Sequence, residues 1–255
     1  MKRLSLIVTV ASFAASAAAA QTPGGAAGGG QRAGGPPPPS NLQILPKDIS
    51  REQLLTTMQA FTTSLGVQCN YCHVQEGRGG RNDMASDEKP TKKTARQMMV
   101  FARELNEKLP AVVGKSANDT TRVGCATCHR GVPIPKPITD IMTEAAANGG
   151  APAGIAKFKE LREKFYGGQS YDFSETTFIT MAQRANAASK YDDALAYLQA
   201  NLDYYPKSTR TYVVMTQMKS AKGDKAGAIQ ALEKAIELDP NNAQLKNQLQ
   251  QLKGQ

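Results

Sequence analysis

The chain has 255 residues, of which 40% are hydrophobic and 21% charged, and it contains no tryptophan. This length and composition are typical of a soluble protein with one or two compact domains. The formal net charge of +9 fits a solvated, lysine-rich surface, so it gives no reason to expect a nucleic-acid partner. All four cysteines fall in two short clusters, which leaves none for a disulfide.

The N-terminus has the three parts of a secretory signal. Residues 1–3 (MKR) include two basic residues, and residues 4–13 are mostly apolar. Residues 18–20 are alanines, which suit a cleavage site. We therefore expect residues 1–20 to be a signal peptide that is cleaved after Ala20 and exports the chain to the periplasm. The alternative is an uncleaved signal that keeps the chain associated with the membrane.

Residues 21–40 are almost entirely Gly, Ala, Pro and Gln, and they include the proline run 36–39. A stretch of this composition has little apolar surface to bury, so we expect a disordered tether. The first folded domain is expected to begin at residue 41.

A first helix is predicted just after the tether. Ser50 and Gln53 have the spacing of a capping box, and Gly66 is a suitable stop. Between them, apolar residues recur at the spacing of one helix face, namely Leu54, Leu55, Met58, Phe61 and Leu65.

A second helix is predicted from about Lys92 to Leu109, because Pro110 should not continue it. The residues that share its apolar face are Ala95, Met98, Ala102, Leu105 and Leu109. Each of the two helices is followed by a cluster of two cysteines and a histidine. The sequence therefore predicts two successive units of helix and cluster, within a domain of residues 41–141.

Residues 173–255 contain a repeat. The segment KYDDALAYLQANLDYYP recurs as DKAGAIQALEKAIELDP, so Ala194 aligns with Ala228, 34 residues later. This period resembles the tetratricopeptide repeat (TPR), a pair of antiparallel helices. Two such units are too few to stand alone, so we expect flanking helices near Ile155–Phe165, within a helical linker of residues 142–172, and near Ala243–Leu252, as a terminal cap.

The two cysteine clusters read CNYCH (residues 69–73) and CATCH (residues 125–129). Two thiols three positions apart can form thioethers with the two vinyl groups of one porphyrin, and the next histidine can bind its iron. The sequence thus predicts two covalently bound haem c groups. The residues expected to hold them are Cys69, Cys72, His73, Cys125, Cys128 and His129.

Zinc knuckles and redox-active dithiols also use Cys-x-x-Cys. The chain has only two histidines, and each directly follows one cysteine pair. Neither an all-cysteine zinc site nor a dithiol requires that arrangement. Covalent haem therefore remains the preferred interpretation.

Each iron needs a sixth ligand, and no further histidine is present. Methionine is the usual alternative and raises the reduction potential. Met58 lies on the first predicted helix and Met98 on the apolar face of the second, each upstream of a haem motif. We expect Met58 and Met98 to be the distal ligands. On spacing alone, Met99 is a rival for the second site, about 100° further round the helix.

The stretch from Leu54 to Pro137 resembles the tetrahaem cytochrome subunit of photosynthetic reaction centres. The resemblance rests on LLTTMQAFTTSLGVQCNYCHV, TARQMMVFARELN and VGCATCHRGVPIPKP, which follow that family's order of helix, turn and haem motif. In the family, a helix-borne methionine is the distal ligand of the haem attached just after it. The resemblance implies this role for Met58 and for Met98 rather than Met99.

The chain also departs from that family. It has two haem motifs where the family's subunit has four, and its C-terminal repeats have no counterpart there. Arg96, Asn106 and Arg130 also match the family, and either solvation or a hydrogen bond to a haem propionate would account for each of them.

Together these features predict an all-α chain with a dihaem c-type cytochrome module (helix then CxxCH, twice) and a TPR-like helical repeat module. The expected function is one-electron transfer without catalysis, because no spare histidine can serve as an acid or base at an open iron. The expected partners are redox proteins of a membrane electron-transport complex, a reaction centre among them, and a protein bound by the repeats. The alternatives are a peroxidase-like enzyme with a displaceable methionine and a binding scaffold with structural or sensory haems.

Overall fold

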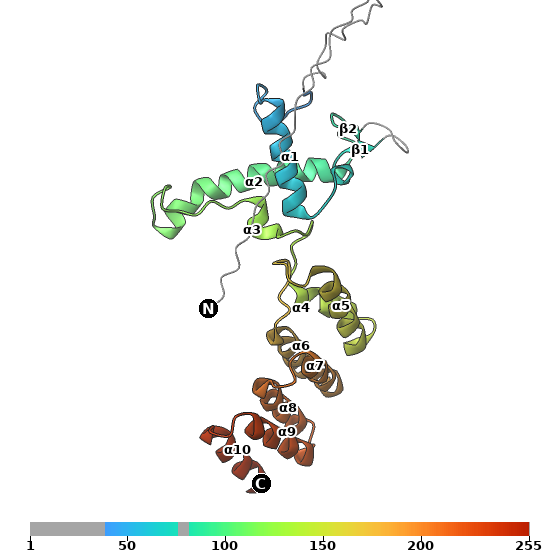
Figure 1. The fold of residues 1–255 in the computed structure, drawn as a ribbon, viewed down its shortest axis with the longest axis vertical. Coiled ribbons are helices and arrows are strands. Elements are labelled where there is room, and N and C mark those ends of the chain that lie inside the picture. The colour runs from blue at the N-terminus through green and yellow to red at the C-terminus, as the bar shows by residue number, and fades with distance from the viewer. Residues whose placement is uncertain (1–38, 76–81, 255) are drawn as a thin grey trace, which may run out of the picture. The chain divides into compact units, whose positions relative to one another are not determined.

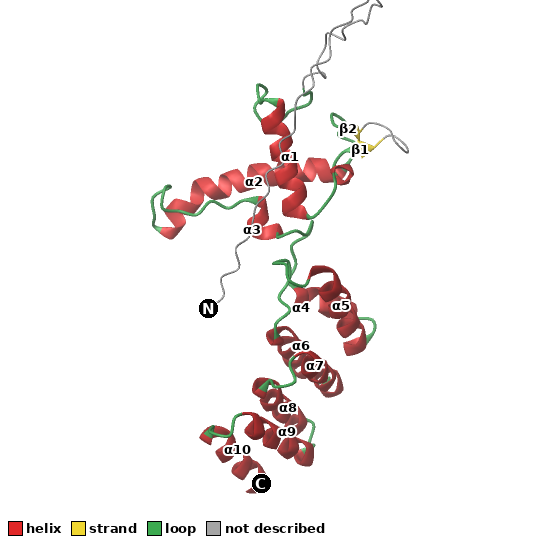
Figure 2. Ribbon diagram, viewed as in Figure 1, coloured by secondary structure: helices red, strands yellow, loops and turns green. Residues whose placement is uncertain are grey.

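A computed structural model of the chain describes residues 39–75 and 82–254 (Figure 1). The predicted signal peptide, residues 1–20, and all but the last two residues of the predicted tether, 21–40, lie outside the described residues. Helices make up most of the described chain, and a single two-stranded ribbon is the strand structure in it (Figure 2). The all-α prediction is therefore confirmed.

The elements follow one another along the chain in a simple order. They are α1 (Arg51–Leu65), the 3-10 turn η1 (Cys69–Tyr71), β1 (Val74–Gln75), β2 (Asn82–Asp83), α2 (Pro90–Val113), α3 (Cys125–His129), α4 (Ile138–Ala146), α5 (Gly150–Phe165), α6 (Glu175–Ala187), α7 (Tyr191–Tyr204), α8 (Thr209–Ala221), α9 (Lys225–Leu238) and α10 (Ala243–Gly254).

Helix α1 begins and ends at the predicted residues. Ser50 accepts a hydrogen bond from the Gln53 amide at 3.2 Å, and the Gln53 side chain accepts one from the Ser50 amide at 3.2 Å. This reciprocal pair satisfies two amides that the first helical turn leaves without partners. Gly66 ends the helix in the left-handed conformation, with φ of 64°.

Helix α2 is longer than predicted at both ends. Pro90 occupies its first turn, where the missing amide hydrogen costs nothing. The expected stop before Pro110 is wrong, because the helix continues to Val113 and ends at Gly114 with φ of 66°. Pro110 lies in the last turn, so the ring removes only the hydrogen bond to the Asn106 carbonyl and the helix ends soon afterwards.

The C-terminal helices repeat at a fixed interval. Helices α6, α8 and α10 begin at residues 175, 209 and 243, and α7 and α9 begin at 191 and 225, so each start recurs 34 residues later. Helices α6, α8 and α10 are directly preceded by Ser174, Ser208 and Asn242. Each of these side chains accepts a hydrogen bond from an amide of the following turn. The 34-residue period of the sequence is thus the period of the helix pairs.

The apolar core of the described residues begins at Val132. A continuous cluster joins α4 and α5 to α6, α7, α8 and α9, with Phe158 and Phe178 fully buried at its centre. A smaller cluster around Leu232 and Leu245 joins α9 to α10. Among the described residues, no helix is both long and apolar enough to cross a bilayer.

Candidate functional site

The first Cys-x-x-Cys-His motif forms a single tight turn after α1. The amides of Cys72 and His73 both donate to the Cys69 carbonyl, at 3.3 and 3.0 Å. This turn brings the three side chains that were predicted to bind one haem onto one short segment of backbone. The ribbon β1–β2 follows directly, with Val74 opposite Asp83.

The second motif forms the short helix α3. The Gly124 amide donates to the Thr127 hydroxyl at 3.0 Å at its start, and Arg130 ends it in the left-handed conformation with φ of 48°. Because residues three and four apart share a helix face, Cys125, Cys128 and His129 are grouped together.

Helix α2 is attached to the first motif by its N-terminal turn. Lys89 donates to the carbonyl of Asn70, and the hydroxyl of Thr91 donates to the carbonyl of Tyr71 at 2.6 Å. The two acceptors are the residues between the cysteines. The backbone of the motif is therefore fixed by side chains from a helix that follows it in sequence.

The same helix is attached to the second motif by Asn106. Its amide nitrogen donates to the Val123 carbonyl at 2.8 Å, and its amide oxygen accepts from the Val123 backbone amide at 2.7 Å. Val123 lies two residues before Cys125. The Asn106 side chain is thus engaged by backbone groups in this structure.

The loop before α2 is organised by a buried lysine. The ammonium group of Lys92, which is 9% exposed, donates to the carbonyls of residues 84, 85 and 86 at 2.8, 3.0 and 2.7 Å. It also pairs with Asp87 at 3.3 Å, and Asp87 pairs with Arg96 at 2.8 Å. The guanidinium of Arg96 holds the pKa of the Asp87 carboxyl far below its usual range.

The end of α1 contacts the segment after α3. The Gly131 amide donates to the Ser64 carbonyl at 2.8 Å. A Cβ atom at Gly66 would lie 2.1 Å from the Gly131 carbonyl oxygen, so the contact requires glycine at residue 66. Gly66 precedes Cys69 by three residues and Gly131 follows His129 by two, so the contact joins the segments next to the two motifs.

The ionisation of the first motif suits a ligand more than a redox dithiol. Burial, with Lys92 nearby, lowers the pKa of His73, which favours the neutral imidazole that binds iron. Burial is the main cause that raises the pKa of the Cys72 thiol, whereas reactive dithiols need a lowered one. In the described residues, no three His, Cys, Asp or Glu side chains converge as the ligands of one zinc ion would.

The two candidate methionines lie on the helices that precede their motifs. Met58 is half-buried on α1, and Met98 is 44% exposed on α2, where Phe101 is 57% exposed one turn later. Met99 is the more buried of the two neighbours. Each cysteine pair and its histidine lie on one turn of backbone, and both methionines lie outside the apolar core clusters.

Haem c fits this part of the chain. Between residues 39 and 131, apart from 76–81, not one apolar side chain is buried, although both α1 and α2 carry an apolar face. The Nδ1 atom of His73 is buried without a hydrogen-bond partner. Two porphyrins would cover these faces, and the residues present are those that thioether and histidine attachment requires.

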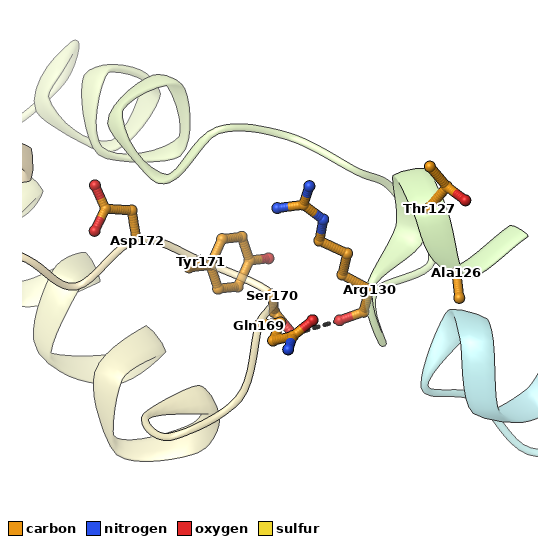
Figure 3. A pocket seen from close by; sticks show the side chains of 7 residues that line it. All are labelled: Ala126, Thr127, Arg130, Gln169, Ser170, Tyr171 and Asp172. Atoms are coloured by element: carbon orange, nitrogen blue, oxygen red, sulfur yellow. Dashed lines mark hydrogen bonds between the residues drawn. The ribbon is translucent and has the colours of Figure 1, made fainter. Parts of the chain in front are cut away.

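A cavity of about 580 Å³ lies beside the second motif, lined by Ala126, Thr127, Arg130 and residues 169–172. The hydroxyl of Ser170 donates to the Arg130 carbonyl at 2.7 Å, as the dashed line in Figure 3 shows. The Arg130 side chain extends on the same side as Tyr171. The end of α3 is therefore held from the loop between α5 and α6 as well as from α1.

Sequence reasoning gave no role to Lys89, Thr91, Lys92 or Asp87. Nothing in a helical pattern marks a buried lysine, because its importance comes from carbonyl groups that a loop folds around it. The one available signal in the sequence was that Lys92 lies on the same side of the helix as Asn106, fourteen residues later.

Comparisons with known proteins agree with this geometry. The sequence model of the family described as "Photosynthetic reaction centre cytochrome C subunit" matches residues 8–229. The chain is 40% identical over 98 residues to the photosynthetic reaction center cytochrome c subunit of Thermochromatium tepidum, covering 38% of this chain and 21% of that protein. It is 37% identical over 94 residues to cytochrome c-554 of Chloroflexus aurantiacus, covering 36% and 20%.

The match therefore spans about a fifth of the length of these curated relatives. Among solved structures, the first TPR of Spaghetti (RPAP3) bound to an HSP90 peptide is similar at 14% identity and a TM-score of 0.32, over 46% of this chain and 88% of that one. A TM-score this low carries no weight here, so the repeat character of α6–α10 rests on the 34-residue spacing of the helices themselves.

Proposed function

Since this chain belongs to the photosynthetic reaction centre cytochrome C subunit family, whose members are haem electron-transfer cytochromes, we propose that it is a periplasmic dihaem c-type cytochrome. Its role is to pass single electrons to or from a membrane electron-transport complex. A photosynthetic reaction centre is the partner that its relatives' names suggest.

In this proposal the cysteines attach the haems, and the histidines and methionines bind the irons. Cys69 and Cys72 hold one haem and Cys125 and Cys128 the other, as thioethers. The proximal ligands are His73 and His129, and the distal ligands are Met58 and Met98. When bound, haem c supplies reversible one-electron chemistry at iron, and a methionine ligand raises its potential.

The observation that carries this proposal is the absence of a protein core around the motifs. Residues 39–75 and 82–131 contain no buried apolar side chain, yet α1 and α2 are regular helices with apolar faces. A helix normally gains its stability by burying such a face. Two haems packed against α1, α2 and α3 supply the missing apolar surface.

The junction of Gly66 and Gly131 supports electron transfer between the two sites. It joins the end of α1 to the segment after α3 through backbone contacts, and α2 braces both motifs with side-chain hydrogen bonds. A rigid frame suits electron transfer because little reorganisation accompanies a change of iron charge.

We further propose the following organisation of the chain: a cleaved signal peptide (1–20), a tether (21–40), the cytochrome part (41–141), a helical linker (142–172) and the repeats (173–255). Helix α4 spans the boundary between the cytochrome part and the linker. The repeats are the part that we assign to a protein partner.

A mass measurement combined with a redox titration tests the proposal. The mature protein is expected to exceed the bare chain by the mass of two haems. In Met58→Ala and Met98→Ala, one haem each should lose its near-infrared sulfur-to-iron band and shift to lower potential. Met99→Ala, which changes the residue next to Met98, is the matched control and should keep both bands.

A mass increase of fewer than two haems would contradict the dihaem assignment. Loss of the band in Met99→Ala instead of Met98→Ala would move the second distal ligand to Met99. A rapidly formed cyanide complex in the unmodified protein would favour a peroxidase-like enzyme over a carrier.

A further inference from the structure

The two proximal histidines differ in their hydrogen bonding. The Nδ1 atom of His129 lies 3.0 Å from the Val132 carbonyl, so a proton on Nδ1 has an acceptor. The Nδ1 atom of His73 is buried and has no partner. When the other ring nitrogen binds iron, Nδ1 carries the proton, and its partner sets the electron density of the ligand.

One carbonyl that acts on His73 also accepts a hydrogen bond from Lys92. The Met84 carbonyl lies near the His73 ring, yet the Nδ1 atom of His73 has no partner in hydrogen-bond geometry. The same carbonyl accepts from Lys92 at 2.8 Å. Lys92 also donates to the next two carbonyls, and these bonds fix the direction in which the loop presents them.

Charged side chains lie around the first motif. Among the described residues, Lys89, Lys92 and Arg96 bring positive charge and Asp83 and Asp87 bring negative charge. Asp87 is shared, at 3.3 Å from Lys92 and 2.8 Å from Arg96. Among the described residues, Lys92 is the one charged side chain that is buried, and the second motif has no equivalent.

Both differences act on the iron in the same direction. A hydrogen bond from Nδ1 makes imidazole a stronger donor, which favours ferric iron, and its loss favours ferrous iron. A buried positive charge opposes the extra positive charge of the ferric state. At the second motif, His129 has its acceptor and no buried cation is present.

Resting on the dihaem function proposed above, we propose that Lys92 is a positioning residue that gives the His73 site a higher reduction potential than the His129 site. It does so by holding the Met84 carbonyl in a direction that leaves Nδ1 of His73 without a hydrogen bond, and by placing its own charge near the ring. When the dihaem protein is reduced by one electron, that electron therefore resides at the His73 site.

A resolved redox titration of three variants in the full-length, haem-loaded protein tests this inference. Lys92→Met should shift the wave of the His73 site to lower potential and leave the other wave unchanged. Asp87→Asn removes a neutralising charge and should shift the same wave to higher potential. Lys93→Met removes an equal charge from the exposed neighbouring residue and should move neither wave.

Opposite signs separate the proposed role from structural damage, because both Lys92→Met and Asp87→Asn break the same ion pair. If both variants shift the wave in one direction, or if Lys93→Met shifts it as much as Lys92→Met does, the inference is overturned. Met58→Ala identifies the wave of the His73 site. If that variant moves neither wave, the ligand assignment fails instead, and the two failures are distinguishable.

Discussion

At the scale of single residues, the contact between Gly66 and Gly131 is the most restrictive feature of the cytochrome part. Gly66 ends α1 at φ of 64° and has the Gly131 carbonyl within 2.1 Å of where a Cβ would lie. Gly114 ends α2 at φ of 66° and has nothing within 4 Å. The two glycines therefore share a backbone conformation and differ only in what surrounds them.

We expect Gly66→Ala to destabilise the haem-loaded protein by about 1–3 kcal/mol more than Gly114→Ala does. Both variants incur left-handed strain, and only the first also forces two backbone segments apart. Thermal unfolding followed by haem absorbance measures the difference. Equal melting temperatures for the two variants would show that α1 and the segment after α3 are not in contact.

At the scale of elements, α2 acts as a brace between the motifs. Its N-terminal turn holds Tyr71 through Thr91, and Asn106 holds Val123. Asn106 lies 15 residues after Thr91, which is about 22 Å along the helix axis. A change at one anchor should therefore affect the motif at that end and leave the other motif unchanged.

The variant Asn106→Leu should test the brace. It leaves the amide and carbonyl of Val123 without partners, which costs about 1–3 kcal/mol for each group that stays buried. We expect lower thermal stability and a changed spectrum of the second haem alone. Asn118→Leu, in the exposed connection after α2, is the matched control. A spectral change confined to the first haem would be the contrary result.

At the scale of the whole molecule, the apolar core is divided unequally. Every buried apolar side chain of the described residues lies at Val132 or beyond, and a continuous cluster runs from α4 into α9. The cytochrome part has hydrogen bonds and ion pairs, and in the proposal above the apolar contact would come from the haems.

A haem-free chain should therefore be folded in one part and not in the other. With all four cysteines changed to serine, we expect fast amide hydrogen exchange in α1 and α2 and continued protection in α6–α9, because exchange follows local opening. Hydrogen exchange detected by mass spectrometry gives both values in one experiment. Strong protection of α1 without haem would contradict the proposed role of the porphyrins in the core.

Much of this organisation was predictable because it depends on local sequence. The capping box at Ser50 and the 34-residue helix period involve residues near one another in the chain, and both predictions are confirmed. The haem ligands themselves remain a prediction from motif chemistry. The end of α2 was predicted wrongly because Pro110 falls in its last turn, where a proline costs little.

Other features depend on contacts between distant residues and leave no local pattern. Lys92 is buried only because the loop of residues 84–87 folds over it. The approach of Gly131 to Gly66 links segments 65 residues apart. From the sequence, a glycine after a helix predicts only that the helix ends there. The helix α4 was not expected, since its role depends on packing against α5 and α6 rather than on its own sequence.

Because α2 is attached at both ends, its length also sets the distance between its two anchors, Thr91 and Asn106. One inserted residue between Thr91 and Asn106 would rotate the far anchor by about 100° and advance it by about 1.5 Å, and even a heptad that nearly restores the direction would displace it by about 10 Å. Insertions and deletions should therefore be excluded from this helix across homologous chains. We expect them after Gly114 instead, where the length of the connection is not fixed by the two anchors of α2.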